Sequence, residues 1–326
     1  MLDLVAAFVL DLALGDPRWF PHPVRLIGRL SSTLEKWIRM VCTSQLGLRL
    51  GGILLTTVVV SLSFISGWLL LQAALRLNTA VYHAVNIVLI YSLLCTRSLG
   101  EEAHQVYRAL QADDLIRARL QLSRIVGRDT EDLSSLEVSR AVVETVAENL
   151  VDGIIAPLLF IMLGGAPLGL AYKAVNTLDS MVGYRNETYR YLGWASARLD
   201  DMVNWIPARL AGWGIIPLAA WLNRLNFRNA LRMVGRDARN HDSPNSGYPE
   251  AAFAGALGIQ IGGSNFYFGK PVYKPTIGDG NLAVPGDIPT SIKLMYTSSI
   301  MTVVLVLIFL IAITGCNLAA SKFFNL

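Results

Sequence analysis

Three carboxylates stand four residues apart in the stretch ETVAENLVDG, at Glu144, Glu148 and Asp152. On an α-helix they would drift by only about 40° per step and would form one acidic stripe. Like charges at this spacing repel one another, and the following residues, 153–172, carry no charge. Mg²⁺ accepts a few carboxylates and keeps water molecules for phosphate oxygens. The stripe therefore predicts a cation-assisted active site at a membrane surface, with a solvated helix face as the simpler alternative.

A second polar stretch, AYKAVNTLDSMVGYRNETYRYLGWASARLDDMVNWIPAR, places acids close to segments that could enter a bilayer. Its acids of interest are Asp179, Asp200 and Asp201. Acidic side chains near a membrane are costly and usually serve a function. A purely structural alternative pairs Arg198 with Asp201 at i,i+3. The other polar residues singled out in this stretch are Lys173, Asn176, Arg185 and Arg209.

Two loop-like clusters add possible ligands for anions. In GDPRWFPHPVRLIGR, prolines fix the backbone around His22, and Arg18 and Arg25 are available to bind anions. The simpler alternative is a helix-entry turn with an exposed histidine. In RDARNHDSPNSGYPEAAFAGALGIQIGG, His241 and Asn245 lie in a turn before a helix of small residues, whose N-terminus could receive phosphate.

The composition indicates an integral membrane protein. Of 326 residues, 53% are hydrophobic and 16% are charged, against about 45–50% and 25% in typical soluble domains. The formal net charge of +4 is typical of membrane proteins with basic cytoplasmic loops. No basic patch is interleaved with aromatic residues, so a nucleic-acid partner is not expected.

Uncharged runs at 50–75, 77–96 and 294–320 are long enough to cross a bilayer. Three further apolar segments are predicted to be broken or re-entrant, because they are short or are interrupted by proline and glycine as in LGGAPLG. These segments are 2–14, 153–172 and 203–222.

The basic residues before the first run predict that residues 15–50 are cytoplasmic. A cytoplasmic helical insert is then expected at 97–152, and a cytoplasmic loop-rich lobe with many turn signals at 223–293. The predicted fold class is an all-α, polytopic helical membrane protein with re-entrant or broken helices, built as a single integral-membrane domain over 1–326.

Six motifs together resemble one known family. They are GDPRWFPHPVRLIGR, IVGRDT, VETVAENLVDGIIAPL, AYKAVNTLDSMVGYRNETY, ARLDDMVNWIPAR and HDSPNSGYPEAAFAGALG. In this order, from about residue 11 to about residue 290, the chain resembles the CobD/CbiB family of cobalamin-biosynthesis membrane proteins, the adenosylcobinamide-phosphate synthases.

The resemblance implies a carbon–nitrogen ligase that uses ATP and Mg²⁺. Its substrates would be a corrinoid, adenosylcobyric acid, and the amine of (R)-1-aminopropan-2-ol, its phosphate or ethanolamine. It also implies a multi-pass protein of the bacterial or archaeal inner membrane, with most polar segments in the cytoplasm. The lipid bilayer is then a partner, and contact with other corrinoid-pathway enzymes or with a second copy of the chain stays open.

Under this hypothesis the acids hold Mg²⁺ and position the amine. The metal ligands would be Glu144, Glu148, Asp152 and Asp179, joined by Asp200 or Asp201. Arg128, Lys173 and Arg185 would face phosphates, and His22 and His241 would transfer protons or contact substrate. The remaining substrate-binding candidates are Arg18, Arg25, Asn176, Arg209 and Asn245.

Other functions stay open at the level of the sequence. The same acids could line the pathway of a transporter for a small charged solute. A more distant similarity to AmpE-like inner-membrane proteins would not bring ligase activity with it. A non-catalytic scaffold for corrinoid enzymes is a third alternative, although it would not need so many unpaired acids.

Overall fold

The computed structural model describes residues 1–17, 22–184, 186–267 and 269–324. The chain is 75% helical with few strands, which confirms the all-α prediction. We expected a single domain over 1–326, whereas the chain divides into two compact units. Unit 1 comprises Met1–Leu94, Pro157–Met202 and Ile300–Leu326, and unit 2 comprises Cys95–Ala156 and Val203–Ser299.

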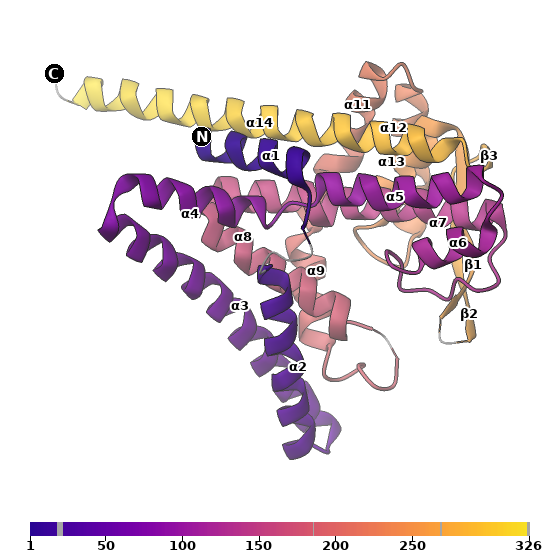
Figure 1. Cartoon of the computed structure of the whole chain (residues 1–326), viewed down its shortest axis with the longest axis horizontal. Helices are drawn as coiled ribbons and strands as arrows, with labels where there is room; N and C mark the ends of the chain where they lie inside the picture. Colours follow the sequence, from indigo (N-terminus) through magenta and orange to yellow (C-terminus); the bar gives the residue numbers. More distant parts are fainter. Residues whose placement is uncertain (18–21, 185, 268, 325–326) are drawn as a thin grey trace. The chain divides into compact units, whose positions relative to one another are not determined.

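Unit 1 is built from long helices (Figure 1). They are α1 (Leu2–Leu14), α2 (Pro23–Val41), α3 (Gln45–Leu77), α4 (Thr79–Tyr91), α8 (Ala156–Val182), α9 (Trp194–Val203) and the distal part of α14 (Asp287–Phe324). Helix α3 packs against both α2 and α4. Asn78 separates α3 from α4, because its extended backbone ends the first helix and its side chain accepts a hydrogen bond from Val81 N at 2.8 Å. This cap turns one apolar run into a helical hairpin.

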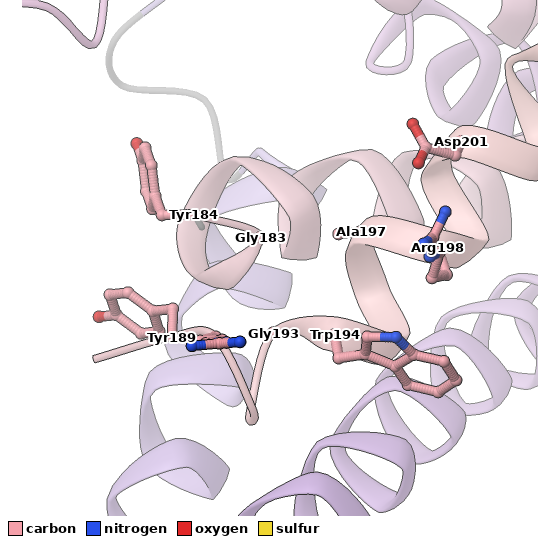
Figure 2. A pocket seen from close by; sticks show the side chains of 9 residues that line it. Gly183, Tyr184, Tyr189, Gly193, Trp194, Ala197, Arg198 and Asp201 are labelled. Carbon is pink, nitrogen blue, oxygen red and sulfur yellow. The ribbon is translucent and has the colours of Figure 1, made fainter. Parts of the chain in front are cut away.

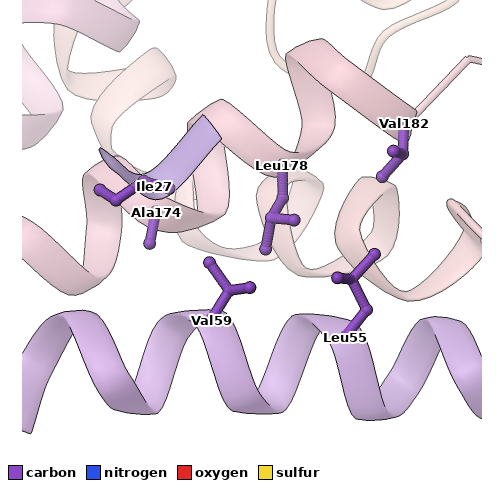
Figure 3. Packing of buried hydrophobic residues seen from close by; sticks show 6 residues of the cluster. All are labelled: Ile27, Leu55, Val59, Ala174, Leu178 and Val182. Atoms are coloured by element: carbon purple, nitrogen blue, oxygen red, sulfur yellow. The ribbon is translucent and has the colours of Figure 1, made fainter. Parts of the chain in front are cut away.

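The core of unit 1 follows from helical spacing. On α8, Ala174, Leu178 and Val182 recur every four residues and therefore share one face. Figure 3 shows this face packing against Leu55 and Val59 of α3. The opposite side of α3 exposes large apolar side chains, including Leu54, Phe64, Ile65, Trp68 and Leu69. An exposed apolar surface of this size is typical of a lipid-facing helix.

Four helical stretches of the described chain are long and apolar enough to cross a membrane: Gln45–Leu77, Thr79–Gln111, Ser135–Val182 and Asp287–Ile313. The crossing runs predicted at 50–75, 77–96 and 294–320 overlap three of them. The fourth contains 153–172, which we expected to be re-entrant, and its length and composition equally allow a crossing. The chain is a membrane protein.

Two of the predicted helix breaks are present. Helix α8 is interrupted at Gly164 and Gly165, where Gly165 has a φ of 69°, just before Pro167. The segment 203–222 is divided into α10 (Trp205–Leu210), the π-turn η2 (Ala211–Ile215) and α11 (Ile216–Leu222). By contrast, 2–14 forms the single helix α1 of 13 residues. This segment is therefore unbroken and too short to span a bilayer by itself, and the re-entrant alternative stays a prediction.

Unit 2 combines helices with a short three-stranded sheet. In addition to α10, η2 and α11, its elements are α5 (Thr96–Gln111), α6 (Leu115–Leu122), α7 (Ser135–Leu150), the π-turn η1 (Val151–Ile155), α12 (Phe227–Asp237), η3 (Ala238–Asn240), α13 (Gly247–Leu257), β1 (Ile259–Tyr267), β2 (Lys270–Ile277) and β3 (Asn281–Leu282). The helical insert expected at 97–152 corresponds to α5, α6 and α7. Helix α7 begins with a capping box, in which Ser134 and Glu137 each bond the other's backbone N–H.

The lobe expected to be loop-rich, 223–293, contains helices and a sheet. Strand β1 pairs with β2 in antiparallel fashion and with β3 in parallel fashion. The β1–β2 pairing is irregular between Ile261 and Gly263. Gly262 and Gly263 have φ values of 88° and 87° there, a backbone region that glycine adopts without steric cost. This irregular stretch brings the backbone N–H of Gly262 to Glu144 on α7.

Candidate functional site

Glu144 is the innermost acid of the predicted stripe. It lies on α7 and is 2% exposed. Its Oε2 accepts a hydrogen bond from Nη2 of Arg128, and its Oε1 accepts one from the backbone N–H of Gly262 at 2.8 Å. Nε of Arg140, one turn earlier on α7, lies 3.8 Å from Oε1. Nitrogen donors therefore supply the countercharge that we had assigned to a metal ion.

This arrangement does not fit Mg²⁺ held by the acidic stripe. Within the described residues, no three His, Cys, Asp or Glu side chains are grouped as they would be around a metal ion. Both oxygens of Glu144 already accept hydrogen bonds. The other predicted ligands are Glu148, Asp152 and Asp179. A protein-held metal at these four residues is therefore not supported by the donor set.

Glu148 and Asp152 have separate surroundings. Oε1 of Glu148 accepts a hydrogen bond from Oγ of Ser246 at 3.1 Å, which ties α7 to the turn before α13. Asp152 lies in the π-turn η1, beyond the end of α7. Because a π-turn does not keep the 100° step of an α-helix, the regular spacing used to predict the stripe ends before Asp152.

A buried acid–base pair lies beside these glutamates. Oε1 of Glu250, on α13, is 3.7 Å from Nε2 of His241, and within the described chain neither atom has a hydrogen-bond partner. The side chains are 2% and 5% exposed. The backbone N–H of Ser243 donates to Nδ1 of His241 at 2.9 Å, which turns Nε2 toward the glutamate.

Burial sets the charge state of this pair. It raises the pKa of Glu250 well above 4.5, and the nearby Glu144 and Glu148 add to the rise while Lys274 opposes it. Burial, assisted by Lys274, lowers the pKa of His241 below 6.5. Burial also acts to lower the pKa of Lys274, but the surrounding carboxylates, Glu250 first among them, outweigh it and raise that pKa. These shifts favour the protonated, neutral form of Glu250, the neutral form of His241 and the charged form of Lys274.

We call this group of six residues the buried charged cluster: Arg128, Glu144, Glu148, His241, Glu250 and Lys274. With Glu250 neutral, two carboxylates face two cations. Arg128 is buried and already paired, since Nη1 donates to Asn265 and Nη2 to Glu144. In this structure its charge is balanced by Glu144, whereas we had expected it to face a phosphate.

Two further predicted residues meet next to the cluster. Nη1 of Arg209 donates to Oδ1 of Asn245 at 3.3 Å. The same guanidinium lies 4.2 Å from the ring centre of Trp205 and 4.4 Å from that of Tyr248. Asn245 is one residue before Ser246, the partner of Glu148. Unit 2 thus brings together Arg209, Asn245, Glu148 and Glu144 from distant parts of the sequence.

The predicted residues of unit 1 lie around α2, α8 and α9. His22 is the N-cap of α2: its Nδ1 accepts a hydrogen bond from Val24 N at 3.3 Å, and its Nε2 lies 3.4 Å from Oδ1 of Asp16. It is the helix-entry residue considered as the simpler alternative. Arg25 follows in the first turn of the same helix. Arg18 and Arg185 lie outside the described residues.

Helix α8 carries three predicted residues on one face. Lys173, Asn176 and Asp179 are spaced by three residues and are half-buried, as expected for a shared helical face. The carboxylate of Asp179 lies against Gly183, where an added Cβ would be 2.0 Å from Oδ1. Asp200 is on α9 and is half-buried.

A pocket of about 380 Å³ lies beyond the C-terminal end of α8. Figure 2 shows Tyr184 and Tyr189 at one end of it and Trp194, Arg198 and Asp201 at the other. Of the residues predicted as catalytic, Asp201 lines this pocket. The remaining lining residues are Gly183, Arg190, Gly193 and Ala197.

Glu250 and Lys274 were missed by the sequence reasoning. Glu250 had a detectable signal, because it is the only charged residue between Asp242 and Lys270, and a lone acid in an apolar helix is expected to be buried for a purpose. Lys274 had none. It reaches the cluster from β2, where it pairs with Gly263 of β1, and the strands themselves were not predicted.

The chain is similar to known proteins of one family. The family model described as CobD/Cbib protein matches residues 4–295. The cobalamin biosynthesis protein CobD of Geobacter metallireducens is 55% identical over 276 residues, which are 85% of this chain and 86% of that protein. CobD of Photorhabdus laumondii is 49% identical, over 95% of this chain and 97% of that protein.

The cobalamin biosynthesis protein CbiB of Salmonella typhimurium is also 49% identical, over 92% of this chain and 94% of that protein. No solved structure is significantly similar to this chain. The chain belongs to the CobD/CbiB family. This confirms the family resemblance carried by the six motifs.

Proposed function

We propose that this protein acts in cobalamin biosynthesis as an ATP-dependent carbon–nitrogen ligase. It would join adenosylcobyric acid to (R)-1-aminopropan-2-ol O-phosphate, giving adenosylcobinamide phosphate, with free aminopropanol or ethanolamine as alternative amines. The family and the names of its relatives support the pathway. The ligation itself is our proposal, and the buried pair of Glu250 and His241 is the observation that carries it.

The chemistry needs two steps, because a carboxylate is a poor acyl donor. In the first, a carboxylate oxygen of the corrinoid acid attacks the γ-phosphorus of ATP, the bond to the bridging oxygen breaks, and an acyl phosphate and ADP form. In the second, the amine nitrogen attacks the acyl carbon and phosphate leaves. The nitrogen must lose a proton before it attacks and another as the amide forms. The second step therefore requires a proton acceptor beside the amine.

Glu250 suits the role of proton acceptor. A carboxylate with a raised pKa is a stronger base than an ordinary one, and burial next to Glu144 and Glu148 raises the pKa of Glu250. The ammonium form of the substrate would be attracted by Glu148 and would favour ionisation of Glu250 as it approaches. Because Nδ1 of His241 accepts from Ser243, Nε2 carries the proton of the neutral ring and would donate a hydrogen bond to Glu250 while it is ionised. Lys274 would face the departing phosphate.

Magnesium enters this proposal with ATP, as the counter-ion of the nucleotide's phosphates. Glu144 and Glu148 accept hydrogen bonds from nitrogen and hydroxyl donors, and the described residues hold no group of three His, Cys, Asp or Glu side chains that could bind it. The reaction also needs cytosolic ATP. We therefore propose a multi-pass protein of the bacterial or archaeal inner membrane, with its polar segments, including those of unit 2, on the cytoplasmic side.

The test is a reaction with the full chain purified in detergent. ATP, Mg²⁺, adenosylcobyric acid and one amine at a time are incubated with the protein, and the corrinoid products are separated by chromatography. We expect adenosylcobinamide phosphate and one ADP per amide formed. Without the amine, hydroxylamine should trap the acyl phosphate as a hydroxamate. Transport of aminopropanol phosphate into proteoliposomes without ATP turnover would contradict the proposal and favour a transporter.

A further inference from the structure

The pocket of Figure 2 is separate in the chain from the buried charged cluster, because all of its lining residues belong to unit 1. It combines two arginines, Arg190 and Arg198, with the rings of Tyr184, Tyr189 and Trp194. Its volume of about 380 Å³ lies within the range for small-molecule sites, about 300–1,000 Å³. A corrinoid with its side chains is much larger, so the pocket suits one of the smaller substrates.

Close backbone packing forms part of the pocket wall. At Gly193 an added Cβ would lie 1.7 Å from the carbonyl oxygen of Val182, and at Gly183 it would lie 2.6 Å from that of Asp179. Only glycine at position 193 allows this residue to approach Val182 so closely, and only glycine at position 183 fits against Asp179. The space between the aromatic and basic side chains is therefore fixed by the backbone of the loop.

Two of the aromatic rings are backed by arginines outside the pocket. The guanidinium of Arg49, on α3, lies 4.0 Å from the ring centre of Trp194, and that of Arg39, on α2, lies 5.1 Å from the ring centre of Tyr189. These cation–π contacts hold the rings in place. Trp194 nevertheless remains 38% exposed, so part of its indole is free to stack on a ligand.

The charge of the pocket favours an anion. Arg190 and Arg198 are both exposed, and within the described chain neither is ion-paired with an acid. Arg49 adds positive charge behind Trp194, whereas the charge of Arg39 is compensated by Glu35, whose Oε1 lies 2.8 Å from its Nε. The lining residues include one carboxylate, that of Asp201, which opposes this positive charge. A carboxylate can accept hydrogen bonds from the hydroxyls of a ribose. A flat ring, a sugar and phosphates together describe a nucleotide.

We propose that this pocket binds the adenine nucleotide, with the base on Trp194 and the phosphates on Arg190 and Arg198. The proposal rests on the ATP-dependent reaction proposed above and assigns its nucleotide to a place. The pocket follows directly after α8 and is backed by the first turns of α3, at the ends of two candidate membrane spans. A lipid headgroup also carries phosphate, but it offers no base for the indole.

The experiment measures binding without turnover. The full chain in detergent is dialysed to equilibrium against labelled ATP with Mg²⁺. We expect Arg198→Gln and Trp194→Leu each to raise the Kd for ATP about tenfold or more, as a charged hydrogen bond and a stacked base commonly contribute that much. Matched controls are Arg228→Gln and Trp221→Leu, both exposed and in unit 2, which should bind ATP as the wild type does.

Partial ligands separate the two roles. Adenosine should lose affinity on Trp194→Leu and keep it on Arg198→Gln, and inorganic triphosphate should show the reverse. Arg190→Gln replaces Arg198→Gln if the latter does not elute as a monodisperse protein. Unchanged ATP affinity in these variants would overturn the assignment. Variants that keep their ATP affinity but lose bound phosphatidylglycerol would show a lipid site instead. Variants that raise only the KM for aminopropanol phosphate would show a site for the amine. If the wild type binds ATP at this pocket and forms no amide, the nucleotide site stands and the proposed ligation fails.

Discussion

Nε2 of His241 lies 3.7 Å from Oε1 of Glu250, and within the described chain neither atom has a hydrogen bond. Leaving such buried atoms unpaired normally costs about 1–3 kcal/mol each. Native proteins rarely keep such a cost without a reason. The distance is too long for a direct hydrogen bond, and an amine nitrogen that contacts both atoms would satisfy them. We interpret the pair as the proton-handling part of a substrate site.

The first prediction concerns stability against pH. The pKa of Glu250 is raised above 4.5, so the stability from its protonated form is complete below that pH and is lost as pH rises through the raised value. The pKa of His241 is lowered from 6.5, so its contribution is complete above 6.5 and is lost only on acidification. Lys274, with its pKa raised from 10.5, contributes no slope until more alkaline pH. A decline in stability as pH rises above 4.5 should therefore belong largely to Glu250, because the contribution of His241 changes in the opposite direction and that of Lys274 begins to fall only at alkaline pH.

Glu250→Gln should flatten this decline. The measurement is the thermal unfolding midpoint in detergent at half-unit steps of pH, for the variant, the wild type and the exposed control Glu131→Gln. The control should follow the wild type. Parallel curves for Glu250→Gln and the wild type would mean that the carboxyl of Glu250 is not held protonated.

The second prediction concerns the tie between Arg128 and Glu144. Breaking a buried ion pair by removing one partner typically costs about 3–5 kcal/mol, because the other charge stays buried alone. Arg128→Met should therefore be strongly destabilising. In the double variant Arg128→Met with Glu144→Gln, the new amide oxygen can still accept from Gly262 N. The double variant should recover about 0.5–3 kcal/mol in a double-mutant cycle, whereas additive losses would show that the two side chains do not interact.

The third prediction concerns the backbone of the pocket. A Cβ at Gly193 would collide with the carbonyl oxygen of Val182, whereas one at Gly214 would meet nothing within 4 Å. Gly193→Ala should destabilise the protein by about 1–3 kcal/mol, as overpacking does, and should weaken ATP binding. Gly214→Ala, measured by the same thermal unfolding and dialysis, should leave both nearly unchanged. Equal effects of the two substitutions would contradict the close approach at Gly193.

The fourth prediction concerns metal removal. Because nitrogen and hydroxyl donors hold Glu144 and Glu148, EDTA should not shift the unfolding midpoint of the protein without substrates. It should nevertheless stop ligation, since ATP reacts as its magnesium complex. A metal bound only to the folded state would stabilise it by mass action. If EDTA lowered the unfolding midpoint by several degrees, this prediction would be contradicted. The metal site that the sequence suggested at Glu144, Glu148, Asp152 and Asp179 would then be supported.

The sequence predicted features that depend on local chemistry. Glycine and proline in LGGAPLG marked the break at Gly164 and Gly165, where a φ of 69° is needed. The apolar runs marked the candidate spans. The four-residue spacing of Glu144 and Glu148 correctly placed both acids on α7 or its end, but it could not show that their partners would be Arg128 and Ser246.

Features that depend on distant pairing were not predictable from one sequence. Lys274 reaches the cluster because β2 pairs with β1, and Gly262 reaches Glu144 because β1 is irregular there. The π-turn η1 changed the helical step before Asp152 without a clear signal. Glu250, by contrast, is predictable, because it is the only charged residue between Asp242 and Lys270. The individual roles of the site residues stay predictions.

The account depends most on Glu250 as the acceptor of the amine's proton. The direct test is the rate of adenosylcobinamide phosphate formation by Glu250→Gln at saturating ATP, beside the wild type and Glu131→Gln. We predict a kcat about 10²–10⁴-fold lower, an unchanged KM for ATP, and loss of the rise in rate with pH that the wild type should show. A variant that forms the amide at the wild-type rate and with the wild-type pH profile would contradict the account.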